Sequence, residues 1–356
     1  MARKKDYGSY RGRSPLRTFL KYVIILLTAV LILAVLALVF LQEYIVYSAD
    51  GIRLEIPFFK NARPAPSSAA SPEPVETDPL VVVTPEITEP EWLHAATLPG
   101  EALYDGTAGR RVEEAGGNAA IFDMKADDGS LGYVSALPLA IAGKVSSGDA
   151  AINAAIRALN QEDLYTIARV SCFKDHKLSN ADRSLAITTN SGYRWTDLDG
   201  VRWVSPTSRT VRQYVADICK ELADLGFDEI LLVNSGYPAE GNLHYIKKGD
   251  AYDKAAFSAV IEEFYAQAAG ALEGYDVKLS ILTDEETLTG AKSELSGQTP
   301  ENLAAHARRI WLRGEGQEAL RILGEAGLPD ENIVRVTDEP DAEAASWAIL
   351  TLPSGP

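Results

Sequence analysis

The sequence predicts an α/β protein whose main part is a (β/α)8 TIM barrel. Short β-like runs alternate with helical patterns after residue 92, and eight such runs are found. They occupy about 265 residues, which is close to the typical length of one such barrel. The first 91 residues are interpreted as a tail, an apolar helix and a linker. A single barrel over residues 92–356 is therefore preferred to two small domains.

A basic tail and a long apolar run begin the chain. Residues 1–21 hold seven basic side chains and one acidic one, Asp6. Residues 22–41 carry no charge, and about 20 apolar residues are what a helix needs to cross the hydrocarbon layer. The run predicts a single transmembrane helix that anchors the protein in the cell membrane. Because a basic flank stays in the cytoplasm, the N-terminus is expected inside and residues 42–356 outside.

A cleaved signal peptide is the alternative to an anchor, because both start with basic residues and an apolar run. A signal peptide normally has an apolar region of about 7–15 residues and small residues at its cleavage site. Here the apolar run is longer, and Tyr47 and Ala49 would occupy the positions that define cleavage. Tyr47 is too large for such a site, so an uncleaved anchor is expected.

Residues 42–91 are predicted to form a stalk and a linker. Residues 50–59 (DGIRLEIPFF) alternate in polarity, which predicts a short strand or stalk. Residues 62–90 are rich in Pro, Ser, Ala, Glu and Thr, a composition that neither buries apolar surface nor sustains a helix. We expect an extended spacer that holds the folded domain away from the bilayer.

The eight predicted strands are distributed along the whole domain. They are Leu93–Leu98, Asn118–Lys125, Leu164–Phe173, Glu229–Asn234, Val277–Leu282, Arg308–Leu312, Asn332–Val336 and Trp347–Leu352. Because strand–helix alternation builds parallel sheets with right-handed crossovers, one parallel sheet is expected. Closure of this sheet would pair the last strand with the first and leave no edge.

A helical pattern precedes each strand from the second onward. The predicted helices are Arg110–Ala115, Ala150–Asn160, Ser208–Leu225, Phe257–Leu272, Pro300–Ala307, Gln317–Ala326 and Asp341–Ser346. Two of them carry clear end signals. Gly226 follows Leu225 at a C-cap position, and Pro300 opens a helix after Thr299 as its N-cap.

The charge of the domain argues against one class of partner. The 356-residue chain has a formal net charge of −16, and beyond the basic tail it holds 27 basic and 49 acidic residues. Such a domain repels nucleic acid, so no nucleic-acid partner is expected. Cys172 and Cys219 lie in apolar patterns and are interpreted as buried free thiols. Four scattered histidines show no metal-ligand spacing, and neither a metal nor another cofactor is predicted.

Candidate site residues follow from the barrel prediction, because TIM barrels carry function at the C-terminal ends of their strands. Asp123 and Lys125 share one face of their strand, and Arg169 lies on the neighbouring strand. If these faces point inward, the three side chains meet near the barrel mouth, where charges must be paired. They then form either an ion-pair network that braces the strands or a polar floor for a ligand.

Aromatic residues gather in the loops around the third and fourth strands. They are Tyr193, Trp195, Trp203 and Tyr237. Sugars stack on such rings through their apolar faces, whereas the alternative is that the tryptophans pack the long loop against the barrel. For Trp203 the packing role is preferred, and for Trp195 both roles remain open.

Three segments of the domain carry motifs that occur together in one family. NAAIFDMKADDGSLGYVS contains a strand with Asp-x-Lys-x-Asp-x-Gly, and LYTIARVSCFKDHKLSNADRSLAI contains Ile-Ala-Arg and Phe-Lys-Asp. GYRWTDLDGVRWVSPTSRTVRQYVADICKELADLGFDEI is the most similar part, with matches at Trp195, Gly200, Trp203, Pro206, Gly226, Phe227, Asp228 and Glu229. From about Trp92 to Leu312, the chain resembles a bacterial family of glycoside-hydrolase barrels of largely unknown function, similar to the α-amylase-type hydrolases.

The chain departs from this family pattern where acidic residues are expected. After Phe-Asp-Glu-Ile, Val233 stands at the position of an Asp and Gly236 at that of an Arg. On the fifth strand, Leu282 stands at the Asp of a Ser-x-Asp pattern. On the sixth, residues 311–315 replace a Pro-Met-x-Tyr-Pro segment. Because Val233 and Leu282 cannot transfer protons, the chain is interpreted as a divergent member.

Together with the predicted anchor, the resemblance implies a membrane-anchored domain outside the cytoplasm that binds or hydrolyses an envelope or surface polysaccharide, as an enzyme or as a pseudoenzyme. Hydrolysis needs two carboxylates about 5–9.5 Å apart. The candidate catalytic residues are Asp123, Asp284 and Glu240, and the candidate substrate-binding residues are Lys125, Arg169, Asp175, Trp195, Asn234 and Tyr237. The alternative is a non-enzymatic scaffold or protein-interaction domain of the cell envelope. An open groove at the mouth would favour glycan binding, and a mouth plugged by side chains would favour the scaffold.

Overall fold

The computed structural model describes residues 45–48, 51–54, 92–290, 292–314 and 316–352. The chain divides into two compact units, residues 1–80 and 81–356. The first contains an antiparallel pair, β1 (Ile45–Ser48) and β2 (Gly51–Leu54), so a strand within residues 50–59 is confirmed. The predicted tail, membrane helix and spacer lie outside the described residues. No helix in the described part of the chain is both long and apolar enough to cross a bilayer.

The second unit contains a closed parallel barrel of eight strands, as predicted. In order around the barrel, the strands are β10, β3, β4, β5, β6, β7, β8 and β9. Their bounds are β3 (His94–Thr97), β4 (Ala119–Lys125), β5 (Tyr165–Ser171), β6 (Glu229–Val233), β7 (Lys278–Asp284), β8 (Arg309–Arg313), β9 (Ile333–Thr337) and β10 (Trp347–Ile349). Trp347 is the register partner of His94, which confirms that the last strand closes on the first.

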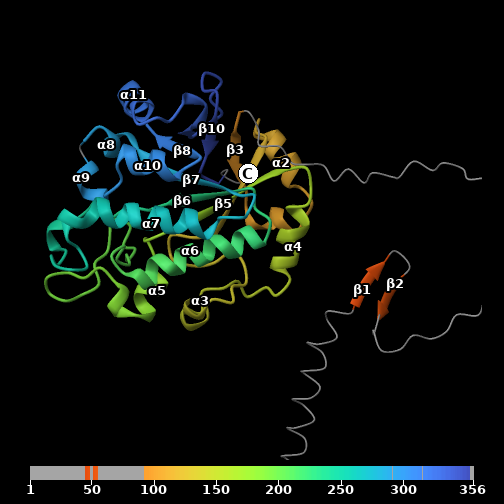
Figure 1. The fold of residues 1–356 in the computed structure, drawn as a ribbon, viewed down its shortest axis with the longest axis horizontal. Coiled ribbons are helices and arrows are strands. Elements are labelled where there is room, and N and C mark those ends of the chain that lie inside the picture. The colour runs from red at the N-terminus through yellow and green to blue at the C-terminus, as the bar shows by residue number, and fades with distance from the viewer. Residues whose placement is uncertain (1–44, 49–50, 55–91, 291, 315, 353–356) are drawn as a thin grey trace, which may run out of the picture. The chain divides into compact units, whose positions relative to one another are not determined.

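Helices surround the barrel (Figure 1). They are α2 (Ala108–Glu114), α3 (Pro138–Gly143), α4 (Ile152–Leu159), α5 (His176–Ala181), α6 (Arg209–Asp224), α7 (Phe257–Ala271), α8 (Glu285–Leu288), α9 (Ser293–Ser296), α10 (Pro300–His306) and α11 (Gln317–Glu325). Six of the seven predicted helices are present. The helix predicted at Asp341–Ser346 is wrong. Asp341 instead accepts hydrogen bonds from the Glu343 and Ala344 amides in a turn, which competes with helix formation.

The longer helices form where their end signals and apolar spacing predict them. Ser208 caps α6 by accepting a hydrogen bond from the Val211 amide, and Gly226 follows the helix with φ +92°, a conformation that glycine adopts without strain. Thr299 and Asn302 form a capping box at the start of α10, with Pro300 in its first turn.

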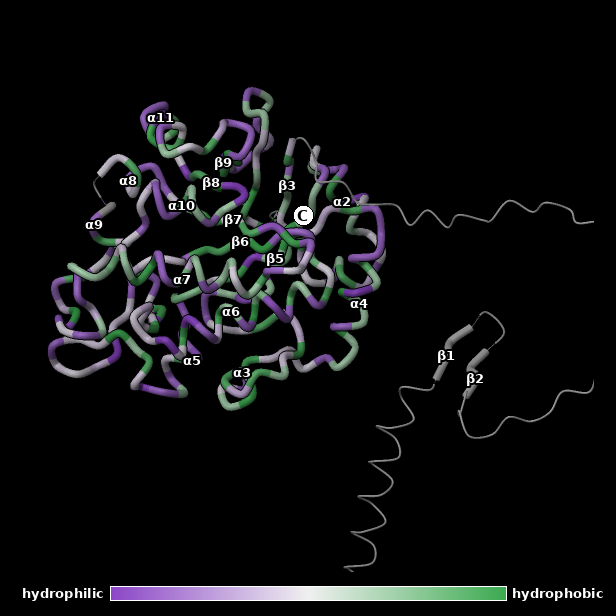
Figure 2. Tube along the Cα trace, in the orientation of Figure 1, coloured by the Kyte–Doolittle hydropathy of each residue, from purple (hydrophilic) through white to green (hydrophobic). Residues whose placement is uncertain are grey.

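Two apolar cores follow from the alternation of side chains along the strands. The outer core packs the helices on the barrel, and the smaller inner core fills the barrel with residues such as Ile121, Ile167, Val233 and Trp311. β6 is accordingly one of the hydrophobic parts of the trace (Figure 2). Within the barrel, Glu229 is fully buried and pairs with Arg309 at 2.5 Å.

The inner face carries polar residues at the end where the strands terminate. Asp123 follows Ile121, Arg169 follows Ile167, and Arg313 follows Trp311 two residues further along each strand. Because alternate residues share a face, these side chains continue the inner layer beyond the core. The fold therefore places a charged layer at the barrel mouth.

Candidate functional site

Two adjoining cavities open at the mouth of the barrel. Their volumes are about 720 Å³ and about 440 Å³, and four residues line both of them: Asp127, Arg169, Leu282 and Arg313. Because the cavities share these residues, they form one groove across the mouth. We call the larger cavity the apolar arm and the smaller one the polar arm.

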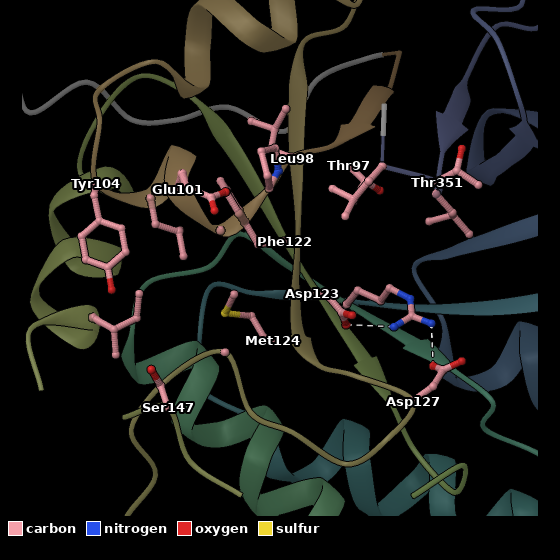
Figure 3. A pocket seen from close by; sticks show the side chains of 18 of the residues that line it. Thr97, Leu98, Glu101, Tyr104, Phe122, Asp123, Met124, Asp127, Ser147 and Thr351 are labelled. Carbon is pink, nitrogen blue, oxygen red and sulfur yellow. Dashed lines mark hydrogen bonds and ion pairs between the residues drawn. The ribbon is translucent and has the colours of Figure 1, made fainter. Parts of the chain in front are cut away.

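The apolar arm lies beside β3, β4 and β10. Its walls include Leu98, Leu103, Phe122, Met124, Ile152, Leu350 and Leu352. Tyr104 is half exposed at its edge and donates a hydrogen bond to Asp149 at 2.6 Å. Figure 3 shows Tyr104 and Glu101 set apart from the charged cluster around Asp123 and Asp127. This arm therefore offers a largely apolar wall and one exposed ring.

One guanidinium joins the two carboxylates of the β4 segment. Arg169 Nη1 donates to Asp123 Oδ1 at 2.8 Å, and Arg169 Nη2 donates to Asp127 Oδ1 at 2.7 Å (Figure 3). Burial raises the pKa of Asp123 although Arg169 opposes this. Burial also acts on Asp127, but the charge and hydrogen bond of Arg169 bring its pKa below the usual value. Two carboxylates on one cation thus have opposite pKa shifts.

The polar arm has a second cationic centre, Lys174. Its Nζ lies 2.7 Å from Asp199, 3.1 Å from Asp197 and 3.7 Å from Asp127. Burial would lower the pKa of Lys174, but these carboxylates raise it overall. Trp203 donates from Nε1 to Asp197 at 3.0 Å. Lys174 therefore links the loop after β5 to the Arg169 cluster.

Asn234 follows β6 and supports the same cluster. Its Nδ2 donates to Ser171 Oγ at 2.9 Å and to Asp127 Oδ1 at 3.1 Å. Its φ is +49°, in the left-handed region that asparagine tolerates better than most residues. The backbone conformation thus directs the amide toward Asp127.

A third cation lies at the outer end of the polar arm. Lys292 pairs with Glu240 and also with Glu286 at 2.7 Å. Burial lowers the pKa of Lys292, but its hydrogen bonds to the two glutamates raise it overall. Asp284 lines the same arm and accepts a hydrogen bond from the Thr287 amide, which caps α8. The candidate acids Glu240 and Asp284 are therefore already engaged in a pair and a cap.

The expectation that Lys125 meets Asp123 and Arg169 at the mouth is wrong. A bulge between Asp123 and Lys125 makes Lys125 the register partner of Val170, a residue of the outer core. Lys125 is fully buried, donates to the Ser171 carbonyl at 2.7 Å and pairs with Asp175 at 2.8 Å.

Asp175 is a structural residue in this arrangement and lines neither arm. Besides pairing with Lys125, it accepts a hydrogen bond from the Leu178 amide and so caps α5. Gly129 has φ +89° and passes so close that an added Cβ would overlap the Asp175 carboxylate. The motif Asp-x-Lys-x-Asp-x-Gly thus supplies Asp123 and Asp127 to the groove, and Lys125 and Gly129 to the buried contacts with Asp175.

The candidate aromatic residues divide between packing and the groove. Trp195 is 2% exposed, lines neither arm and donates from Nε1 to the Asn242 carbonyl, so it packs the loop. Tyr237 lines the polar arm, stacks on Phe257 at 3.7 Å and shares a hydrogen bond with Thr207. Trp203 lines this arm although it is mostly buried. Tyr193 is exposed.

Two apolar residues stand at the positions where the family resemblance implied acidic ones. Val233 is buried in the inner core, and Leu282 packs against that core and lines both arms. Val233 therefore faces the barrel interior, and Leu282 faces its mouth. In the described part of the chain, no group of three or more His, Cys, Asp or Glu side chains is arranged to hold a metal ion.

Several groove residues lie beyond the candidates derived from the sequence. They are Asp127, Lys174, Asp197, Asp199, Lys292 and Arg313. Asp127 belongs to a recognisable motif, and Lys174 and Arg313 directly follow predicted strands, so all three had a local signal. The others lie in long loops whose folding brings distant residues together.

Residues 110–310 match a family described as "Putative glycosyl hydrolase domain". A hypothetical protein from Ruminiclostridium thermocellum is 27% identical, with 52% of this chain and 96% of that chain covered and a TM-score of 0.45. The glycoside hydrolase domain of PgaB (BpsB) from Bordetella bronchiseptica is 12% identical, with 72% and 93% covered and a TM-score of 0.51, in agreement with the barrel fold. A chitinase from Chromobacterium violaceum is 14% identical, with 69% and 68% covered and a TM-score of 0.40. Comparison with curated proteins gives no match.

Proposed function

Because the chain belongs to this family of glycosyl hydrolase domains, we propose that its barrel binds a glycan in the groove across its mouth without hydrolysing it. The observation that carries the proposal is the apolar character of Val233 and Leu282 at the inner face. Glycoside hydrolysis normally uses two carboxylates on either side of the scissile bond. Neither side chain can take such a role.

Most of the remaining carboxylates of the groove support the same conclusion. Asp123, Asp127, Asp197, Asp199 and Glu240 are all ion-paired, through Arg169, Lys174 or Lys292. A carboxylate held by a cation keeps its proton less readily, which weakens it as a general acid. Asp123 is the exception, because burial raises its pKa in spite of Arg169. The pairs instead make a fixed set of donors and acceptors suited to hydroxyl groups.

The open groove favours glycan binding over the scaffold alternative. A plugged mouth would leave no room for a ligand, whereas the two arms together span the barrel end. The polar arm presents Asn234 and the paired charges to hydroxyls, and the apolar arm presents Tyr104 as an exposed ring. Such a mixture of polar groups and rings matches the two faces of a sugar.

Hydrolysis remains a second candidate because of one observation. Asp123 and Asp127 have pKa values shifted in opposite directions, the pattern that separates an acid from a base. Against it, both carboxylates bind the same guanidinium instead of facing each other across open space.

The proposed ligand is an envelope or surface polysaccharide, because the sequence predicts an anchor at residues 22–41 and a barrel outside the cytoplasm. External protease on intact cells should then release a barrel-sized fragment by cutting within residues 62–90. A shed protein beginning near residue 50 would show instead that the apolar run is a cleaved signal.

The test of function uses the full-length protein in detergent, screened against wall and capsular polysaccharides for binding and for release of reducing ends. We expect saturable binding and no release, since loss of a general acid alone removes about 10²–10⁴ in rate. Steady release that is abolished by Asp123→Asn, Asp284→Asn or Glu240→Gln would overturn the loss of catalysis. Absence of any binding would favour the scaffold.

A further inference from the structure

Arg313 differs from the other cations of the groove. Arg169, Lys174 and Lys292 each pair with two or more carboxylates. Arg313 is exposed, and its side chain makes no hydrogen bond or ion pair with any residue that the structure describes. Its neighbour in register, Asp284, uses its carboxylate to cap α8. The guanidinium is therefore available to a ligand.

The position of Arg313 makes it relevant to whatever fills the groove. It ends β8 on the inner face, two residues after the buried Trp311, and it lines both arms. A ligand that crosses from one arm to the other passes this residue. Leu282 and Leu350 line the apolar arm together with Arg313, and nearby apolar groups strengthen a charge pair by displacing water.

We propose that Arg313 binds an oxyanion carried by the glycan, either a uronic-acid carboxylate or a phosphate ester. This inference rests on the proposed function and specifies its ligand class. A guanidinium presents a planar fork of donors that matches carboxylate and phosphate oxygens. A guanidinium without a partner in the groove can bind a single anionic group of the ligand.

The rest of the groove limits how much negative charge the ligand carries. Glu101 and Asp284 line the arms without an ion pair to any described residue. The chain as a whole has a net charge of −16. These negative charges would repel a polyanion. The expected ligand therefore bears one anionic group near Arg313 and neutral sugars on either side.

The test observes the Arg313 Nε–H signal by ¹⁵N NMR in the full-length protein in detergent micelles, assigned by its loss in Arg313→Lys. The protein is titrated with glucuronate, glucose 6-phosphate and glucose. We expect a saturable shift with one or both anions and none with glucose. A shift with glucuronate alone identifies a carboxylate, and one with glucose 6-phosphate alone a phosphate. Equal shifts with all three sugars, or none with either anion, would overturn the proposal.

A second measurement separates this inference from the proposed function. The two ligands are an oligosaccharide with one glucuronate and its neutral methyl ester. Arg313→Gln should lower the affinity for the charged oligosaccharide by about ten- to a hundredfold and leave the affinity for the ester unchanged. Arg157→Gln is the matched control, because Arg157 is exposed on α4 and lines neither arm. If the wild type binds both ligands with equal affinity and Arg313→Gln weakens neither, the groove binds glycans but the proposed anion site is wrong. If neither binds, both proposals fail.

Discussion

Arg169 Nη1 lies 2.8 Å from Asp123 Oδ1, and the two residues are also direct register partners on β5 and β4. The ion pair is thus set by the pairing of the strands and not by the loops above them. It forms a fixed base for the groove, on which Asp127 and Asn234 are then positioned. A rigid base is what a binding site needs to orient a ligand at low entropic cost.

The first prediction concerns Asp127 and pH. Its pKa is lowered in the folded protein, so its ion pair stabilises the fold above the unfolded pKa of about 3.9. That stabilisation is lost as pH falls through the lower, folded pKa. The difference in unfolding free energy between wild type and Asp127→Asn should therefore shrink as pH falls from about 5. Denaturant unfolding at several pH values measures it.

Asp163→Asn is the control for this series. Asp163 is exposed and has no ion pair with any described residue, so its replacement should change stability little at any pH. A difference for Asp127→Asn that is constant or grows toward low pH would contradict the sign of the pKa shift.

The second prediction concerns the buried pair Lys125–Asp175. Asp175→Asn leaves the Lys125 ammonium buried without its counter-charge, which should cost about 3–5 kcal/mol of unfolding free energy. The double variant Lys125→Met with Asp175→Asn removes both charges and should recover much of this loss. Thermal and urea unfolding provide the measurement.

A surface ion pair is the control for the Asp175→Asn measurement. Arg110 and Glu114 are both exposed and lie 2.7 Å apart on α2, so Glu114→Gln should cost no more than about 1 kcal/mol. If Asp175→Asn costs as little as Glu114→Gln, the burial of the Lys125 pair has no energetic consequence.

The sequence was informative about the barrel because eight apolar β-like runs alternate with helical spacing, and each run became a strand. Its limits are visible at particular residues. Alternation predicted the Asp123–Arg169 pair correctly, but one bulge turned Lys125 to the outer layer. Bulges depend on how a strand pairs, and local residue patterns do not encode them. The short helices α3, α5, α8 and α9 were not predicted, because each is too brief to show periodicity.

The groove itself was less predictable than the strands. Lys174 pairs with Asp197 and Asp199, and Lys292 with Glu240, through loops that are distant in sequence. No periodic pattern connects such residues. Trp195 shows the reverse difficulty: it matches a family motif, yet it is buried in loop packing. Motifs alone did not separate residues that build the loop from those that line the groove.

The third prediction separates the backbone of Asn234 from its amide. Asn234→Gly keeps the φ of +49° without strain and removes the hydrogen bonds to Asp127 and Ser171. Asn234→Ala removes the same bonds and adds left-handed strain, which costs roughly 1–2 kcal/mol more. Both variants should weaken glycan binding equally and lose stability with the lost bonds, and Asn234→Ala should have the lower melting temperature of the two. Equal melting temperatures of Asn234→Gly and Asn234→Ala would show that alanine at this position causes no backbone strain.

The last prediction concerns closure of the barrel. β10 is only three residues long, yet it pairs with both β3 and β9 and buries Trp347 and Ala348. Removing the chain from Trp347 onward would expose the edges of β3 and β9 and open one side of the inner core. We expect this truncation to abolish cooperative unfolding of the whole barrel, followed by circular dichroism during heating. Leu352→Ala is the control, because Leu352 is 57% exposed and follows the strand. A truncated protein that still melts cooperatively at the wild-type temperature would show that the barrel does not depend on closure.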